Sequence, residues 1–473
     1  MYARRMAYDA ILERAHAHAR AYLGTLPARH VNARMPDPST GDPAMLCEPV
    51  PPPEILDALA RLIDDAGLAT AGPRYFGFVT GGSFPVAVAA DWLVSAWDQN
   101  AALHVMSPAM AALEDVTAAW LLDLFRLPPA SSVGFVTGAT MANVTCLAAG
   151  RHEVLRQAGW DVEADGLQGA PRLQVVVGAG VHAAIESAAR ILGFGTSNLI
   201  RVAADAQGRM IPDALAATLA RTSGPTLVCL QAGHVNTGAF DPFDPLIDLA
   251  HRHDAWVHVD GAFGLWARAA EEAGVRRLAD GLEAADSWGV DAHKWLNVPY
   301  DSGIAIVAKP AAHRASMAQR ASYLLRSEGE RRDGMDWTPE ASRRARAVPI
   351  YAVLKSLGRQ GVSDLVMNGC ARARQMASLL GAHPGITILN DVVLNQVLVR
   401  AASPSGANIT PDVIAQVQRD GVCWVGGTTW GGEAAMRISI SNWATSPGDI
   451  EESAASIARA AASIPNFQLP TPN

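Results

Sequence analysis

Between residues 86 and 310, short apolar runs alternate with stretches that have a helical pattern. The clearest runs are 174–177, 226–230, 255–259 and 304–307. Strands that are apolar throughout and alternate with helices are typical of a mostly parallel sheet covered by helices. In such sheets, ligands bind beside the carboxyl ends of the strands. The alternation therefore predicts an α/β fold with its functional site at those strand ends.

The rest of the chain predicts two further parts. Its 473 residues exceed what one hydrophobic core ordinarily supports. Helical patterns before the first strand, and short strands mixed with helices from about residue 380, predict smaller units on either side of the α/β part. We expect an N-terminal helical segment at 1–85, a large domain at 86–345 and a small α+β domain at 346–473.

Charge and composition exclude several classes of partner. The net charge of −8 argues against nucleic acid or an anionic membrane surface as the main partner. No apolar stretch approaches the roughly 18 residues of a membrane span, and no apolar segment follows the first charged residues as in a signal peptide. The five cysteines are scattered without a CxxC pair, which indicates reduced thiols and a cytoplasmic protein.

Lys294 is an unusual residue for its position. It follows the apolar run 287–291 and precedes Trp295 and Leu296. Lysine is almost never fully buried without a partner, and burial favours its neutral, nucleophilic amine. Lys294 is therefore a candidate Schiff-base lysine.

Two other segments fall at predicted helix starts. Residues 137–143 bring small side chains and hydroxyls to a helix N-terminus, which favours an anion. Thr140 or Asn143 can equally be a simple helix cap. His182 follows the run 174–177 and is placed either to stack on a flat heterocycle or to serve a structural role.

Asp260 closes the run 255–259 and needs a cationic partner if it is buried. A protonated pyridine nitrogen would serve, and so would an arginine in a core ion pair. A metal site formed by His251, His253, His258 and Asp260 is a weaker alternative, because the first two are expected on a helix and the others on a strand.

Together these segments predict pyridoxal phosphate as the cofactor. The helix start would hold the phosphate, His182 would stack on the ring, Asp260 would pair with the ring nitrogen, and Lys294 would bond the aldehyde. Each element is ambiguous alone, whereas their shared position at strand ends makes the set specific. We expect no metal in the site.

The sequence resembles the group II pyridoxal-phosphate decarboxylases, which act on aromatic amino acids, glutamate, histidine or diaminobutyrate. The resemblance covers about residues 50–445 and is strongest at 285–303. Shorter matching stretches are 75–85, 107–114, 137–143, 238–242, 258–262 and 342–346. It implies a fold type I, aminotransferase-like homodimer with its active sites at the subunit interface.

The resemblance also implies roles for individual residues. Lys294 would form the internal aldimine with His293 beside it, and His182 and Ala262 would pack on the two faces of the ring. Ala139, Thr140 and Asp291 would lie at the phosphate, and Asp260 at the ring nitrogen. Asn236 stands where the family usually has a threonine near the 3′-oxygen of the cofactor.

Tyr323 falls in the polar stretch where the family carries a catalytic tyrosine. That residue would return a proton to Cα after carbon dioxide leaves, with His182 as the other candidate. A phenylalanine there accompanies aldehyde formation in family members, so Tyr323 favours simple decarboxylation. The alternative is a loop tyrosine that packs on the surface.

The substrate is expected to be an L-amino acid, with an aromatic one as the leading candidate. Gly77 and Ala102 replace bulky aromatic residues of aromatic-amino-acid decarboxylases, which enlarges or reshapes the pocket. Tryptophans near Arg437 in the sequence could line it, namely Trp424, Trp430 and Trp443. Alternative functions are another reaction on the same scaffold, such as a carbon–carbon lyase, aldehyde synthase or aminotransferase, or a non-catalytic cofactor-binding protein.

Overall fold

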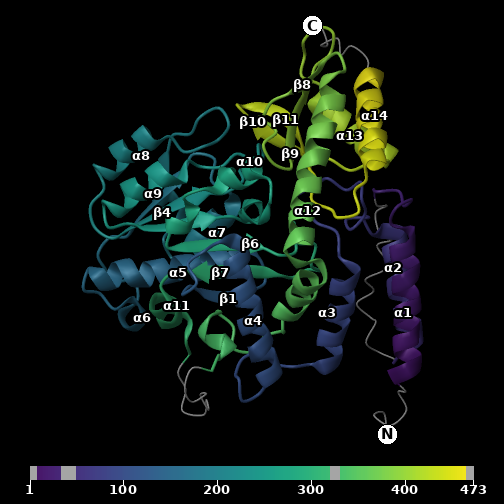
Figure 1. The fold of residues 1–473 in the computed structure, drawn as a ribbon. Coiled ribbons are helices and arrows are strands. Elements are labelled where there is room, and N and C mark those ends of the chain that lie inside the picture. Colours follow the sequence, from purple (N-terminus) through teal and green to yellow (C-terminus); the bar gives the residue numbers. More distant parts are fainter. Residues whose placement is uncertain (1–7, 33–48, 320–330, 465–473) are drawn as a thin grey trace.

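The computed structural model describes residues 8–32, 49–319 and 331–464. The helices before the first strand are α1 (Tyr8–Thr25), α2 (Pro52–Ala66), α3 (Pro85–Trp97) and α4 (Pro108–Phe125). Proline begins α2, α3 and α4, where its missing N–H would have had no helical acceptor. Figure 1 shows α1 and α2 packed against each other at one edge of the molecule.

Within the described residues, a seven-stranded sheet forms the centre of the molecule. Its strands are β1 (Ser132–Val136), β2 (Gln174–Gly178), β3 (Leu199–Val202), β4 (Thr226–Gln231), β5 (Trp256–Asp260), β6 (Ser287–Asp291) and β7 (Gly303–Val307). They lie in the order β1-β7-β6-β5-β4-β2-β3. Strands β2 to β6 run parallel, whereas β7 is antiparallel to both β1 and β6. The predicted mostly parallel α/β sheet is confirmed.

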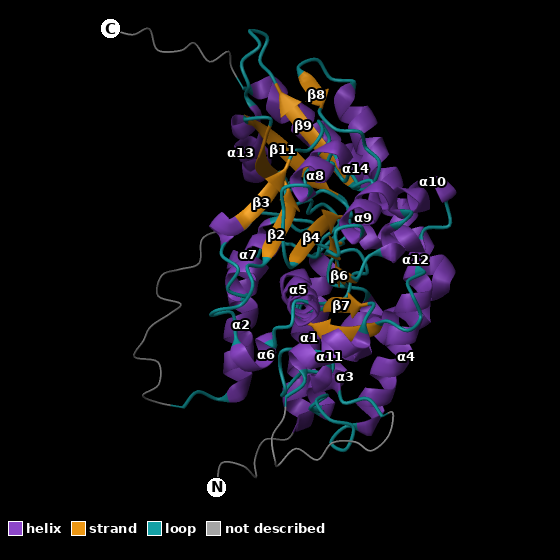
Figure 2. Cartoon of the chain, turned by 90° about the vertical axis from the view of Figure 1, so that its left-hand side faces the viewer, coloured by secondary structure: helices purple, strands orange, loops and turns teal. Residues whose placement is uncertain are grey.

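Helices cover both faces of this sheet, as Figure 2 shows. The helices that follow β1 in this part of the chain are α5 (Ala139–Gln157), α6 (Val162–Asp165), α7 (Ala183–Ile191), α8 (Pro212–Leu219), α9 (Phe243–His251), α10 (Ala273–Arg276) and α11 (Pro310–Met317). Helix α5 packs across β5, β6 and β7. The strands β1, β5, β6 and β7 are buried along their whole length, which explains why apolar residues predominate in them.

A smaller antiparallel sheet lies toward the C-terminus, in the order β10-β11-β9-β8. Its strands are β8 (Ile386–Ile388), β9 (Gln396–Ala401), β10 (Gly426–Trp430) and β11 (Glu433–Ser439), and α13 (Thr410–Asp420) and α14 (Pro447–Ser463) accompany it. Helix α12 (Ala347–Gly381) packs against α3, α4 and α14, with non-helical φ and ψ at Gly358. The domain boundaries stay a prediction. In the described part of the chain, no helix has the length and apolarity needed to span a membrane.

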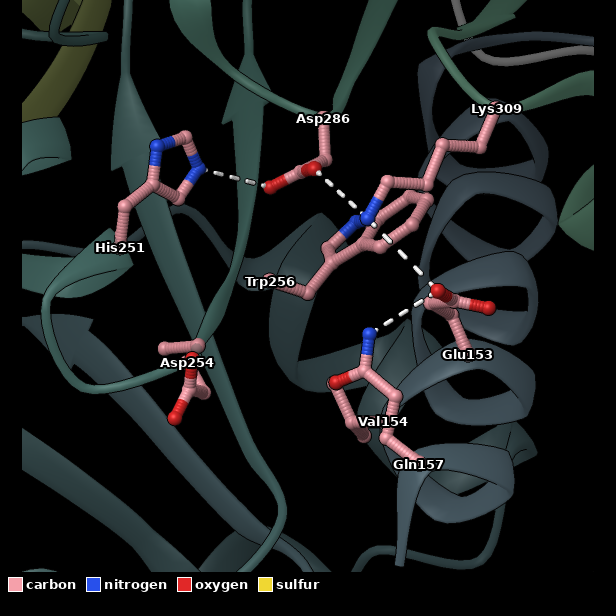
Figure 3. Close-up of a pocket in the computed structure, with 9 residues that line it drawn as sticks. Glu153, Val154, Gln157, His251, Asp254, Trp256, Asp286 and Lys309 are labelled. Carbon is pink, nitrogen blue, oxygen red and sulfur yellow. Dashed lines mark hydrogen bonds and ion pairs between the residues drawn. The ribbon is translucent and has the colours of Figure 1, made fainter.

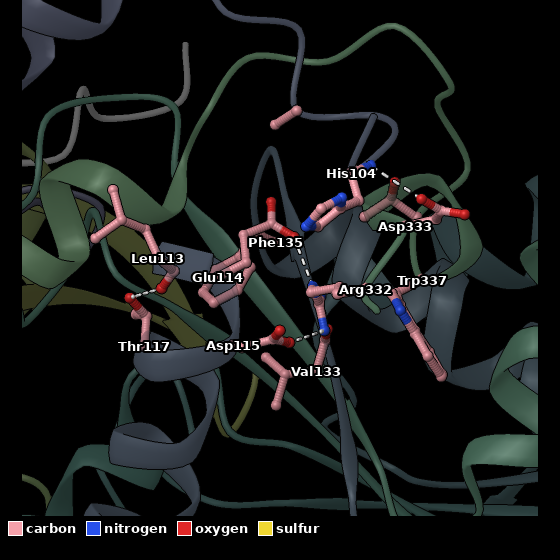
Figure 4. A network of polar contacts seen from close by, with 12 residues as sticks. His104, Leu113, Glu114, Asp115, Thr117, Val133, Phe135, Arg332, Asp333 and Trp337 are labelled. Carbon is pink, nitrogen blue, oxygen red and sulfur yellow. Dashed lines mark hydrogen bonds and ion pairs between the residues drawn. The ribbon is translucent and has the colours of Figure 1, made fainter. Parts of the chain in front are cut away.

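A buried charge cluster joins α4 to the segment that leads into α12 (Figure 4). Glu114 of α4 accepts from Arg332 Nε at 2.8 Å and from Arg343 Nη1 at 2.5 Å. The three side chains are almost completely buried. Burial alone raises the pKa of Glu114, but the charges of Arg343 and Arg332 lower it by more, so the net pKa lies below its usual range. Glu114 is thus a buried anion shared by two cations.

Candidate active site

Lys294 lies in the turn that connects β6 to β7, at the carboxyl end of β6. The backbone N–H groups of Ala292 and His293 both donate to the carbonyl oxygen of Ser302, at 3.0 and 3.2 Å. These bonds tie the start of the turn to its end. The position of the lysine backbone is therefore set by both strands.

The Lys294 amine is paired in this structure. Its Nζ lies 2.9 Å from Oδ2 of Asp291. Burial lowers the pKa of Lys294, but the charge and hydrogen bond of Asp291 raise it by more, so the net pKa is above its usual value. The expectation that burial alone would favour a neutral amine is wrong here, because a carboxylate lies three residues earlier in the chain.

Asp291 also occupies the N-terminus of α5. Its Oδ1 accepts from the Ala139 backbone N–H at 2.5 Å and lies 3.3 Å from His293 Nε2. No side chain caps this helix at Gly138, and Thr140 is exposed. The residues expected at the phosphate, Ala139, Thr140 and Asp291, therefore lie together at a helix N-terminus, where Asp291 accepts from the first N–H group.

Asp260 ends β5, next to β6 in the sheet. Its Oδ1 accepts from the Ala262 backbone N–H at 3.1 Å and its Oδ2 from Asn143 Nδ2 at 3.3 Å. The side chain is buried, and among the described residues it has no arginine or lysine ion-pair partner. The core ion pair considered as its alternative role does not form within those residues. Asp260 is a buried carboxylate that accepts one amide N–H on each oxygen and has no cationic side chain as partner among the described residues.

His182 is the N-cap residue of α7, and its Nδ1 accepts from the Ala184 N–H at 3.2 Å. Burial lowers the pKa of His182, with Asp260 acting in the opposite direction and Lys294 and Arg437 in the same one. The imidazole is therefore neutral at pH 7 and lies within electrostatic reach of both Asp260 and Lys294. It combines the structural capping role with a place in the site.

The sequence did not single out His234, which lies beside His182. Its Nδ1 accepts from the Asn236 N–H at 3.2 Å, and its ring meets the Trp430 ring edge-on at 5.3 Å. Burial, together with His182, lowers the pKa of His234 to about 4. Asn236 is buried, and its Oδ1 accepts from Thr428 of β10 at 3.1 Å. The Asn236 side chain thus connects the site to the small sheet.

Arg437 of β11 brings a positive charge to the same region. Its charge lowers the pKa of both His182 and His234, and burial lowers its own pKa. The described residues offer its guanidinium no hydrogen bond or ion pair. A mostly buried cation without an anion indicates that an anionic group of a ligand pairs with it.

His293 lies beside Lys294, as expected, and packs against the ring of Tyr300, with the ring centroids 4.3 Å apart and the ring planes tilted by 32°. Its Nδ1 accepts from the Ser302 N–H at 3.1 Å, and burial lowers its pKa. Tyr300 also acts on the pKa of Lys294, so it belongs to the surroundings of the lysine, although nothing in the sequence pattern pointed to it. Tyr323 lies outside the described residues.

The wall of the expected substrate pocket is reshaped at Gly77 rather than enlarged. A Cβ atom on Gly77 would lie 2.2 Å from Cζ3 of Trp424, so the indole occupies the space beside the glycine. Trp424 also stacks on Tyr75, with the centroids 5.0 Å apart. A tryptophan from the small C-terminal part of the chain therefore takes the place where a larger residue at position 77 would project. Ala102 is buried.

The residues of the alternative metal site lie in different parts of the structure. His251 bonds Asp286 at 3.1 Å in a pocket of about 270 Å³ that Lys309, Trp256 and Glu153 also line (Figure 3). His258 is buried in the core instead, 3.0 Å from Asn143. Within residues 8–32, 49–319 and 331–464, no group of three or more His, Cys, Asp or Glu side chains could hold a metal ion.

The residues fit pyridoxal phosphate on their donor chemistry. A buried carboxylate without a cation suits a protonated ring nitrogen, and the N-terminus of α5, which begins after Gly138, suits a phosphate. A lysine amine lies at the end of the strand next to that of the carboxylate. These groups come from β5, β6 and α5, which pack directly against one another.

Comparison with known proteins supports the same conclusion. A family model described as the pyridoxal-dependent decarboxylase conserved domain matches residues 44–402. The chain is 30% identical to an L-2,4-diaminobutyrate decarboxylase of Rhizobium meliloti, over 77% of this chain and 73% of the relative. It is 29% identical to an aromatic-L-amino-acid decarboxylase of Bacillus atrophaeus, over 70% and 68%. The fold is similar to that of Oryza sativa TDC crystallised with PLP and tryptamine, with a TM-score of 0.90, 21% identity and 98% and 99% of the chains covered.

Proposed function

The chain belongs to the pyridoxal-dependent decarboxylase family, and from that premise we propose that Lys294, Asp260 and His182 carry out its reaction. The protein is a carboxy-lyase that decarboxylates an amino acid with pyridoxal 5′-phosphate as cofactor. The observation that best supports this assignment is the buried Asp260 carboxylate, which has no cationic side chain as partner in the described residues and lies one strand from Lys294.

When bound, the cofactor supplies an aldehyde that bonds amines and a protonated ring that accepts electrons from the bond to the carboxylate. Lys294 provides the amine that holds the aldehyde, and Asp260 keeps the ring nitrogen protonated. His182 and Ala262 would hold the ring between them. The remaining proposed contacts are Ala139, Thr140 and Asp291 at the phosphate, with Asn236 and His293 at the edge of the site.

A proton must reach Cα after carbon dioxide leaves. We assign its delivery to Tyr323, with His182 as the second donor. Tyr323 falls outside the described residues, so its assignment stays with the sequence pattern. His182 is neutral at pH 7, and its Nδ1 accepts from the Ala184 N–H, which leaves the ring proton on Nε2. The Nε2 proton is therefore the one that His182 would deliver to Cα.

The state of the Lys294 amine gives a testable pH dependence. Asp291→Asn should allow the protein to take up cofactor at lower pH than the wild type does. Only the neutral amine bonds an aldehyde, and Asp291 raises the pKa of Lys294. The measurement is the rate at which visible absorbance appears after cofactor-free protein is mixed with saturating pyridoxal phosphate between about pH 6 and 10. Asp301→Asn, which removes a nearby exposed carboxylate, should leave the profile unchanged, and equal profiles for all three proteins would refute this reasoning.

Arg437 is the proposed partner of a substrate carboxylate. Arg437→Met should raise KM about 10- to 100-fold, which corresponds to the loss of one charge-assisted hydrogen bond. The matched control is Arg400→Met on the neighbouring strand β9, because Arg400 is paired with Glu433 at 2.8 Å and lies on the surface. Steady-state kinetics with the best substrate compare the variants. A KM for Arg437→Met within twofold of the control would contradict the assignment.

We propose an L-amino acid as the substrate, with an aromatic one as the first candidate because Trp424 and Trp430 lie at the site. The test is to incubate the protein with each of the twenty standard amino acids and common non-protein ones and to measure the carbon dioxide released. Product analysis separates the alternatives: an amine indicates decarboxylation, an aldehyde with ammonia and peroxide indicates an aldehyde synthase, and exchange of the amino group indicates an aminotransferase. A bound cofactor with no turnover of any panel member would favour a non-catalytic homologue.

We propose that the protein is a homodimer with its active sites at the interface. Helix α2 exposes Ile55, Leu59 and Ile63 at helical spacing, and Phe78 and Tyr300 are exposed beside the site. Such apolar groups are usually covered by another chain. Analytical ultracentrifugation should give twice the chain mass of 49.8 kDa, and a monomer at working concentration would contradict this proposal.

The proposed location is the cytoplasm. Its support is the unpatterned set of cysteines, of which Cys146, Cys229, Cys370 and Cys423 are free and buried, while Cys47 lies outside the described residues. Fractionation of the native cells, followed by immunodetection, is the direct measurement. Recovery in the membrane or extracellular fraction would contradict the proposal.

A further inference from the structure

A continuous chain of hydrogen bonds extends behind Asp260 into the core. Its first link is the 3.3 Å contact between Asp260 Oδ2 and Asn143 Nδ2. Its second is the 3.0 Å contact between Asn143 Oδ1 and His258 Nε2. Asn143 comes from α5 and His258 from β5, and both side chains are fully buried. The side chain of Asn143 therefore bridges the carboxylate and the imidazole.

The chain continues on the other side of His258. The Nδ1 atom lies 3.0 Å from Oγ of Ser287, the first residue of β6. The indole N–H of Trp256, at the start of β5, donates to the same Oγ at 3.0 Å. Ser287 and Trp256 are buried as well. The relay, as we call Trp256, Ser287, His258 and Asn143, thus reaches from the amino ends of the strands to the carboxylate at their carboxyl end.

The two ends of the relay fix the direction of every bond in it. A carboxylate can only accept, so the Asn143 amide must turn its NH₂ toward Asp260 and its oxygen toward His258. His258 must then donate from Nε2. Burial lowers the pKa of His258 to about 4, so it carries one ring proton, and Nδ1 must accept. The indole of Trp256 can only donate, so the Ser287 hydroxyl accepts from it. The hydroxyl proton of Ser287 is then available to donate to His258 Nδ1.

We propose that Asn143 and His258 are positioning residues that hold Asp260 as an oriented, unprotonated acceptor for the cofactor ring nitrogen. This inference rests on the role proposed above for Asp260. All donors of the relay point toward the carboxylate, which disfavours its protonated form and fixes its Oδ2. The other oxygen is held by the Ala262 N–H at 3.1 Å. The carboxylate plane is thereby set before any ligand arrives.

The test uses the full-length protein freed of cofactor and titrated with pyridoxal phosphate. Asn143→Leu and His258→Leu remove the donors and should raise the cofactor dissociation constant about 10- to 100-fold, the usual cost of removing an outer-shell partner. Both should also shift the visible absorption band of the bound cofactor, because the ring nitrogen is less firmly protonated. His258→Gln keeps a donor close to the position of Nε2 and should restore the affinity to within about threefold.

The matched control is Thr145→Val on the same helix. Thr145 is fully buried, and its hydroxyl donates to Met141 O at 2.9 Å, outside the relay. This variant should keep the wild-type affinity and spectrum. A purely structural role for the relay predicts lower thermal stability with an unchanged spectrum, and that result would overturn the proposal.

The remaining outcomes separate this proposal from the proposed function. A wild-type protein that does not bind pyridoxal phosphate would overturn both. A wild-type protein that binds it, together with an Asn143→Leu variant of equal affinity and spectrum, would overturn the positioning role alone. If circular dichroism shows that Asn143→Leu is unfolded, His258→Leu decides. It removes the donor that orients the Asn143 amide without adding a second carboxyl group beside Asp260, so wild-type affinity and spectrum in this variant would overturn the role.

Discussion

Lys294→Ala should lower kcat by at least about 10³-fold, and the purified variant should lose its cofactor on dialysis. The reason is that Lys294 Nζ is the amine placed at the ends of β5 and β6, 2.9 Å from Asp291 and one strand from Asp260. No neighbouring side chain in the described residues can replace it. The measurement is product formation under saturating substrate, together with the visible absorbance of the protein before and after dialysis.

The chain contains only three lysines, Lys294, Lys309 and Lys355, which makes the control unusually direct. Lys309→Ala removes a half-exposed lysine from the pocket of Figure 3 and should leave activity and colour unchanged. Borohydride reduction of the wild-type protein should then fix the cofactor to a single peptide, the one that contains Lys294. Cofactor found on either of the other lysines would show that Lys294 is misassigned.

Glu114→Gln should destabilise the folded protein by about 3–5 kcal/mol. The variant keeps the shape of the side chain but leaves Arg332 and Arg343 buried without their shared anion. Asp115→Asn is the matched control, because the neighbouring Asp115 is exposed and only 3.9 Å from Arg332, so its loss should cost less than about 1 kcal/mol. Urea unfolding, followed by circular dichroism, gives both values. Equal midpoints for the two variants would show that the cluster contributes little.

The same cluster predicts how the stability of the folded protein changes at acidic pH. The pKa of Glu114 is lower in the folded protein than in the unfolded chain, so its contribution is fully present above the unfolded pKa. That contribution is lost as the pH falls through the lower, folded value. The difference in stability between wild type and Glu114→Gln should therefore be largest near neutral pH and should shrink in acid.

The sequence was sufficient to predict strands and site residues that are marked by a local pattern of residues. Strands such as β4 and β5 were predicted nearly to their ends, because buried parallel strands carry a continuous apolar run. Lys294 and Asp260 were selected because a charged residue at the end of such a run is rare. The family resemblance then supplied the remaining site residues, whose individual roles stay predictions.

Contacts between distant segments could not be predicted in the same way. Trp424 lies beside Gly77, and Asn143 bonds both Asp260 and His258, although these residues are far apart in the sequence. Their pairing depends on how the helices and the small sheet pack on the central strands. The pairing of Lys294 with Asp291 is local in the sequence, but the family resemblance predicted that Asp291 lies at the phosphate.

The turn between β6 and β7 has a consequence for how the cofactor is captured. The turn that carries Lys294 connects two neighbouring strands, because β7 runs antiparallel to β6. The carbonyl oxygen of Ser302, at the end of this turn, accepts from N–H groups at its start. The conformational entropy of this turn is lost when the protein folds, not when the cofactor binds. A preorganised lysine of this kind favours tight retention of the cofactor through successive turnovers, each of which releases the lysine and recaptures it.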